Sequence, residues 1–185
     1  MKKFRFLFLV LAFPCATQAA DLPDEIIFHL GQVAERHQHF HETRTLKALT
    51  APIQSEGELI YRHPGYLAKI THTPRPEQLI VSGDQVSMTR GNRPAHQVPI
   101  DANPALRLMI DTLRAPLDGD MPALKRHYTL SATGDLSHWN LVLTPADAQS
   151  AKIVHGVTLE GQNNAISTVT VTQANGDFSK TIIDP

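Results

Sequence analysis

Hydrophobic residues recur with two different spacings along this chain, and the change of spacing separates helices from strands. Near the start, apolar residues recur three and four positions apart, which predicts an amphipathic helix from Asp21 to about His37. Asp21 is placed to cap this helix, and Pro23 suits its first turn. The apolar stripe consists of Ile26, Ile27, Leu30, Val33 and Ala34.

Beyond this helix the period becomes two, which is the spacing of strands with one buried face. Short runs rich in Val, Ile, Thr and Leu are separated by Pro-Gly, Gly-Asp and similar turn pairs. Because most connections are short, we expect neighbouring strands to pair antiparallel. The strands predicted in this half are 40–49, 57–63, 65–73, 77–82 and 85–89.

A second amphipathic helix is predicted in the middle of the chain, before the strands resume. Asn103 suits its cap and Pro104 its first position, and Pro116 is expected to end it. A further helical turn is predicted at 119–125. The apolar stripe of the second helix is Leu106, Met109, Ile110 and Leu113, and the later strands are 126–132, 136–144, 153–161, 165–173 and 178–183.

The predicted elements total about ten or eleven strands and two or three helices, which indicates an α+β fold. An antiparallel sheet of that size has to curl. Its concave face then offers an apolar surface against which the two amphipathic helices can pack.

The first residues of the chain are typical of a secretory signal peptide, which we place at residues 1–19. Basic residues precede a short apolar run, and a small-residue exit ends at Ala19. The only cysteine, Cys15, lies in this segment and follows Pro14, which argues against a lipidation site. Cleavage would remove three of the 17 basic residues and none of the 18 acidic ones, leaving a net charge of about −4. This acidic balance disfavours nucleic acid as a partner. The signal peptide predicts that the protein is exported to the periplasm.

Several short motifs, in order along the chain, resemble the periplasmic outer-membrane lipoprotein carrier (LolA-type) family. The motifs cover early hairpins, the start of a mid-chain helix and a later strand that ends at Thr144-Pro145. They are 57–64 with Leu67, Pro74, 79–84, 103–106 and 139–145. The stretch from Leu113 to Tyr128 looks more like a divergent LolA-like branch, whose members often accompany export systems for lipids or polyene pigments.

The resemblance implies one carrier domain over residues 20–185, a curled antiparallel half-barrel closed by lid helices over an apolar cavity. It implies a carrier that takes an acylated lipoprotein, or another lipid or polyene cargo, from an inner-membrane exporter to an outer-membrane acceptor. Neither a cofactor nor catalysis is implied, and we expect a monomer. An envelope sensor or assembly module that binds a protein partner with the same fold is the alternative, and a hydrolase of lipid-like esters is a third reading.

The resemblance also implies which residues face the cavity and which one holds the lid. His63 stands where the typical carrier has an arginine that bonds the lid shut, so it is the predicted lid latch; its plain alternative is a strand-end histidine. Each apolar candidate could equally be an ordinary core residue. The predicted cavity residues are Leu59, Tyr61, Leu67, Leu106, Met109, Ile110, Leu113 and Trp139.

Other candidate chemistry is sparse in this sequence. His37, His39 and His41 alternate and would share one face of a strand, a spacing that His-based metal sites use, but a solvated helix-to-strand junction explains them as well. We therefore expect no metal site. The chain has no Gly-x-Ser-x-Gly, His-Glu-x-x-His or phosphate-binding glycine loop, and we expect no enzymatic activity.

Overall fold

A computed structural model describes residues 21–185, so the predicted signal peptide and Cys15 lie outside the described residues. Eleven strands form one antiparallel sheet in the order β6-β5-β4-β3-β2-β1-β11-β10-β9-β8-β7. Their bounds are β1 Glu35–Thr45, β2 Ile53–Arg62, β3 Tyr66–Thr73, β4 Glu77–Ser82, β5 Gln85–Arg90, β6 His96–Pro99, β7 Tyr128–Asp135, β8 His138–Pro145, β9 Val154–Gln162, β10 Ala165–Gln173 and β11 Phe178–Ile183.

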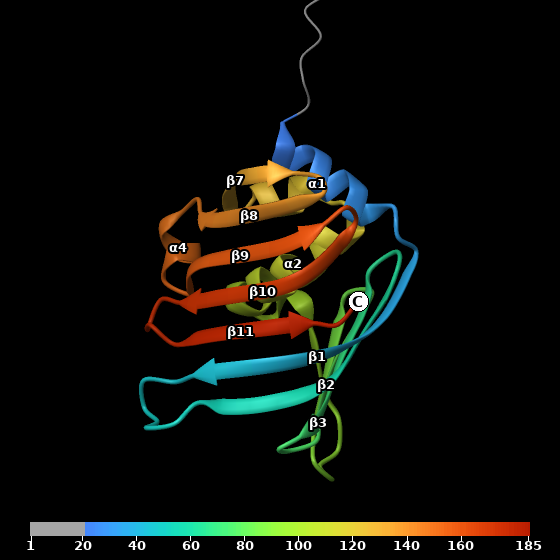
Figure 1. The fold of residues 1–185 in the computed structure, drawn as a ribbon. Coiled ribbons are helices and arrows are strands. Elements are labelled where there is room, and N and C mark those ends of the chain that lie inside the picture. Colours follow the sequence, from blue (N-terminus) through green and yellow to red (C-terminus); the bar gives the residue numbers. More distant parts are fainter. Residues whose placement is uncertain (1–20) are drawn as a thin grey trace, which may run out of the picture.

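The sheet consists of two meanders that meet where β1 pairs with β11. Phe40 of β1 lies between Gly57 of β2 and Ile183 of β11, which fixes the register across this junction. The sheet curls, so that β7–β11 and β1 lie in front and the strands after β3 turn behind them (Figure 1). The predicted α+β fold, a curled antiparallel half-barrel with helices on its concave side, is confirmed.

The helices lie on the concave side and at one end of the sheet (Figure 1). The Asn103 side chain accepts a hydrogen bond from the backbone N–H of Leu106 and so caps the long helix α2. Within residues 21–185, every helix is too short or too polar to cross a membrane. The helices are α1 Leu22–Gly31, the 3₁₀-helix η1 Ile100–Ala102, α2 Pro104–Asp118, α3 Met121–Lys125 and α4 Ala148–Ala151.

The structure corrects two predicted helix ends. Helix α1 stops at Gly31, not near His37, because β1 already begins at Glu35 and continues the sheet. Helix α2 continues past Pro116 to Asp118 and ends at Gly119, whose φ of 70° is left-handed. A proline so near the C-terminal end removes only one helical hydrogen bond, so the helix continues and the predicted end at Pro116 is wrong. The sequence reading also missed the short elements β6 and α4.

Two apolar clusters form the core, and α2 contributes to both. The larger cluster joins α1 and α3 to β7, β8 and β9, and receives Leu108 and Ala115 from α2. The smaller joins β2–β5 to η1 and is completed by Ile110, with Leu106 and Leu113 packed against it. The apolar side chains of α2 therefore occupy the concave side of the sheet, where the sequence reading expected a cavity.

A pair of glycines brings the ends of α1 and α2 together, and a methyl group at Gly31 tests this contact. A Cβ at Gly31 would lie 2.7 Å from Cα and 2.9 Å from N of Gly119, which are backbone atoms that cannot rotate away. We expect Gly31→Ala to lower the free energy of unfolding by about 2 kcal/mol. In β9, a Cβ at Gly156 would meet only the Leu143 carbonyl at 3.8 Å, so Gly156→Ala is the matched control in urea unfolding. Equal stability of the two variants would contradict the close helix contact.

Candidate functional site at the end of the lid helix

Helix α2, which we call the lid helix, is tied to the sheet at its C-terminal end through Asp118. Its Oδ1 accepts a hydrogen bond from the Tyr61 hydroxyl at 2.7 Å and another from the backbone N–H of Gly65 at 2.9 Å. Its Oδ2 lies 3.5 Å from Nε of Arg114, one turn earlier in the helix. The carboxylate thus joins the lid helix to β2 and to the turn between β2 and β3.

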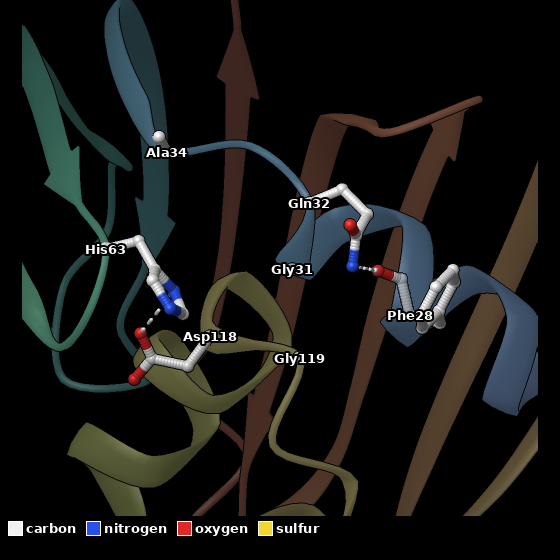
Figure 2. A pocket seen from close by; sticks show the side chains of 7 residues that line it. All are labelled: Phe28, Gly31, Gln32, Ala34, His63, Asp118 and Gly119. Carbon is white, nitrogen blue, oxygen red and sulfur yellow. Dashed lines mark hydrogen bonds and ion pairs between the residues drawn. The ribbon is translucent and has the colours of Figure 1, made fainter.

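The predicted latch residue His63 lies beside this carboxylate. Nδ1 of His63 is 3.1 Å from the Tyr61 hydroxyl oxygen and 3.9 Å from Asp118 Oδ1, and Figure 2 shows the imidazole turned toward Asp118. Its side chain is 44 % exposed, against 17 % for Asp118. Asp118 therefore makes the direct contacts, while the role of His63 as a latch stays a prediction.

The residues around Asp118 are set for hydrogen bonding in a partly buried site. Burial, and then the hydrogen bond to Asp118, raise the pKa of the Tyr61 hydroxyl far above its usual value, so it stays protonated and donates. Arg114 donates from Nη1 to the carbonyl of Gly83 at 3.0 Å, which extends the network to the turn between β4 and β5. We call Tyr61, His63, Arg114 and Asp118 the latch cluster.

A surface pocket of about 380 Å³ opens beside the latch cluster. Figure 2 shows the end of α1 on one side of it and His63 with Asp118 on the other, while the Phe28 ring points away from them. Phe28 is 61 % exposed. The pocket is lined by Phe28, Gly31, Gln32, Ala34, His63, Asp118 and Gly119. A second pocket, of about 370 Å³, is lined by residues of β7, β8, β9 and β10 around Trp139 and Gly161.

The predicted cavity residues of β2 and β3 share one face of the sheet. Tyr61 is the direct partner of Leu67, and Leu59 lies two residues from Tyr61 on the same strand. Tyr61 and Leu67 are buried in the smaller cluster, while Leu59 is half-buried. The structure therefore places these three on one face and packs Tyr61 and Leu67 in the same cluster as Ile110 of the lid helix.

The predicted residues of the lid helix do not all point the same way. Ile110 is fully buried in the smaller cluster, and Leu106 and Leu113 are half-buried against it. Met109 is 41 % exposed and belongs to neither cluster among the described residues. Whether any of the four contacts a ligand stays a prediction.

Trp139 lies in the larger cluster, whereas Tyr61 of the latch cluster belongs to the smaller one. Its side chain is buried, its ring packs on Gly161, and its Nε1 donates to the carbonyl of Asn163 at 3.2 Å. These contacts are those of a core residue that holds β8 against the turn between β9 and β10. Its predicted ligand contact remains untested.

A second carboxylate, Asp111, ties the middle of the lid helix to the other half of the sheet. It is only 2 % exposed, and its Oδ2 accepts from Nε of Arg107 at 2.9 Å and lies 3.1 Å from Nε2 of His127. Nη2 of Arg126 lies 3.6 Å from the same oxygen. Because His127 directly precedes β7, this cluster joins the lid helix to the edge of the larger cluster.

Sequence reasoning missed both carboxylates, although one signal for Asp118 was present. An acidic residue at the end of a helix faces the negative end of the helix dipole and is unfavourable there unless it has partners. Asp118 immediately precedes the helix-ending Gly119, so its position could have been noticed. The groups that stabilise the Asp118 carboxylate come from β2 and from the turn between β2 and β3, and hydrophobic periodicity does not reveal them.

The three alternating histidines lie on the convex face, away from the lid helix. His37 Nε2 is 2.7 Å from a carboxylate oxygen of Glu58, whose other oxygen is 3.2 Å from His72 Nε2. These contacts lower the pKa of the Glu58 carboxyl. Over residues 21–185, no group of three or more His, Cys, Asp or Glu side chains is arranged to hold a metal ion.

Comparison with known proteins assigns the chain to a family. Residues 15–184 match the family described as outer membrane lipoprotein carrier protein LolA-like. The protein belongs to this LolA-like family. Members of the family are carriers and binding proteins, and the predicted divergent LolA-like resemblance is confirmed.

Two solved structures are similar to this chain at low identity. A LolA superfamily protein from Nitrosomonas europaea is 9 % identical with a TM-score of 0.46, and the match covers 89 % of this chain and 90 % of that one. A chain of the Pseudomonas aeruginosa MucA/MucB complex is 12 % identical with a TM-score of 0.42, covering 88 % of this chain and 54 % of that one. This chain therefore spans about half the length of the second relative. A search of curated proteins finds no match.

Proposed function

We propose that this LolA-like protein is a periplasmic carrier that shelters the acyl chains of a lipoprotein or another lipid-like cargo. It takes the cargo from an inner-membrane exporter and passes it to an outer-membrane acceptor. The predicted signal peptide at residues 1–19 supports export to the periplasm. Family membership supports a binding protein that needs no catalytic group.

The observation that carries the proposal is the way the lid helix closes the concave face. Its apolar side chains complete two separate clusters, while Asp118 and Asp111 attach it to the sheet through polar contacts. Polar contacts can be exchanged for water when the helix moves, whereas the apolar face it uncovers needs a new apolar partner. An acyl chain supplies that partner, and its burial is favourable by about 0.8 kcal/mol per CH₂ group.

The first test is native mass spectrometry of the protein purified from its own periplasm, with organic extraction of whatever is bound. We expect a stoichiometric acyl or polyene species, because the uncovered concave face cannot remain in water. A protein that is empty, and that also ignores a fluorescent 16-carbon fatty acid, would contradict the carrier. A stable protein partner without acyl ligand would favour the envelope sensor.

The face that receives the ligand can be mapped separately by cross-linking from the sheet. A photoreactive 16-carbon fatty acid is expected to label the protein when a reporter residue replaces Leu59 or Leu67 on the concave face. Reporters at Ile60 and Arg62 are the matched controls, because they alternate with Leu59 and Tyr61 along the same strand. Labelling confined to the controls would place the ligand on the convex face.

A further inference from the structure

An ion pair lies on the concave face of the sheet and joins β1 to β3. Nζ of Lys69 in β3 is 2.8 Å from Oε2 of Glu42 in β1. The Lys69 side chain is 26 % exposed and that of Glu42 is 11 % exposed. The same face carries buried apolar residues of both clusters, so a charged pair there is out of keeping with its surroundings.

The strand register explains how the two side chains meet across an intervening strand. Lys69 stands between Leu59 of β2 and Leu79 of β4, and its side chain reaches diagonally across β2 to Glu42. Gly57 lies opposite Phe40 and has no side chain in the way. Nζ of Lys69 lies 4.7 Å from the centre of the Phe40 ring, a cation–π distance.

The carboxylate of Glu42 is kept ionised by its neighbours. The hydroxyl of Ser55 donates to Oε2 at 3.2 Å, and that of Thr181 lies 3.4 Å from Oε1. Burial alone would raise the pKa of Glu42, but Lys69, Arg44 and the Ser55 hydrogen bond together hold it below its usual value. The pair is therefore a true ion pair at neutral pH.

Charge pairs at partly buried sites contribute little net stability, because the charges lose their hydration. An apolar pair of similar size would fit this face at least as well. Arg44 lies two residues beyond Glu42 on β1 and so on the same face, which gives the region two positive groups and one negative group. Lys69 also has three N–H donors, and Glu42 engages one of them.

We propose that Lys69 and Arg44 bind the anionic head group, a carboxylate or a phosphate, of an acylated ligand on the concave face. The acyl chain then lies along the apolar side chains next to Lys69, beginning with Leu59 and Leu79. Glu42 holds Lys69 in place while the site is empty and shares it once an anion binds. This inference rests on the proposed carrier function and names the chemistry of its ligand.

Paired ligands that differ only in charge test the inference. Titration calorimetry compares hexadecanoate with hexadecanol, and a single-chain lysophosphatidate with the matching monoacylglycerol. We expect Lys69→Met to weaken binding of both anions about tenfold or more, since a charge-assisted hydrogen bond is lost, and to change binding of the neutral partners less than about twofold. Lys180→Met is the matched control, because Lys180 is exposed on the opposite face of β11.

Substitutions at Glu42 provide an independent test, which remains available if Lys69→Met does not fold. Glu42→Gln is expected to strengthen binding of both anions, since it removes the competing carboxylate and leaves Lys69 free. If Lys69→Met alone fails to fold, the double variant Glu42→Gln/Lys69→Met removes both charges together; it is expected to bind anions about tenfold more weakly than Glu42→Gln does, and neutral amphiphiles equally well.

The outcomes separate this inference from the carrier function. Equal loss of hexadecanoate and hexadecanol binding in Lys69→Met would overturn the head-group site while leaving the carrier intact. Inorganic phosphate binding as tightly as lysophosphatidate would overturn it too, because the acyl chain would then contribute nothing. Failure of the unaltered protein to bind any of the four amphiphiles would reject the carrier function itself.

Discussion

Replacing Asp118 by alanine is expected to lower the free energy of unfolding by about 3 kcal/mol. The change leaves the Tyr61 hydroxyl and the Gly65 N–H without their acceptor, and each unpaired, partly buried group costs about 1 to 3 kcal/mol. For a chain of this length, that loss corresponds to a fall in Tm of roughly 6 to 12 °C. Urea unfolding and thermal melting measure it directly.

The same variant tests whether Asp118 holds the lid helix closed. Asp118→Ala is expected to speed uptake of a fluorescent 16-carbon fatty acid and the amide exchange of α2, because the end of the helix is freed from β2. Asp24→Ala is the control: Asp24 is 46 % exposed and makes one ion pair, with Lys125. The control should change stability by no more than about 0.5 kcal/mol. Unchanged uptake by Asp118→Ala would show that the lid is held elsewhere.

The second large effect is expected for Asp111→Ala, which should lower the free energy of unfolding by about 3 kcal/mol. The buried carboxylate faces Arg107, His127 and Arg126, so its removal leaves Arg126 without this counter-ion and Arg107 with only the exposed Asp101. The loss should appear in urea unfolding as a lower midpoint with an unchanged slope.

A control for Asp111 is available on the same arginine. Asp101 also lies 2.9 Å from Arg107, but it is 76 % exposed, so Asp101→Ala should alter the unfolding free energy by less than about 0.5 kcal/mol. Each variant thus removes an ion pair of 2.9 Å to Arg107, and the two carboxylates removed differ in how deeply they are buried. Equal effects would mean that burial of Asp111 contributes nothing to the anchor.

Together the two carboxylates explain how one helix can be both part of the core and movable. Asp118 joins the lid helix to β2 and its following turn, and Asp111 joins it to the start of β7 in the other half of the sheet. They are seven residues apart, or about 10 Å along the helix. Release of Asp118 would free the C-terminal end of the helix while Asp111 still holds its middle.

Much of the fold could be predicted because strand periodicity is local. The alternation in 77–82, 165–173 and 178–183 marked β4, β10 and β11 with their observed bounds. The start of β1 was missed because Glu35, Arg36 and the three histidines carry little apolar pattern. That strand belongs to the sheet because β2 and β11 pair with it on both sides, and no local signal reports such pairing.

The candidate site divides in the same way. That Leu59, Tyr61 and Leu67 share a face followed from strand parity and the resemblance, and the register confirms it. The latch at His63 stays a prediction; the hydrogen-bond acceptor beside it is Asp118, 55 residues further along the chain. Lys69 and Glu42 were passed over because each appears alone as an ordinary exposed strand charge.

The sequence by itself determined most of the strands, the two amphipathic helices, the shared face of Leu59, Tyr61 and Leu67, and the resemblance to a carrier family. Those properties depend on residues a few positions apart, which periodicity and caps record. The tertiary structure alone decided that β1 pairs with β11, and that Asp118, Asp111 and the Lys69–Glu42 pair meet their partners. Each of these contacts joins residues whose separation in the chain is unrelated to any repeat, so only the folded path brings them together.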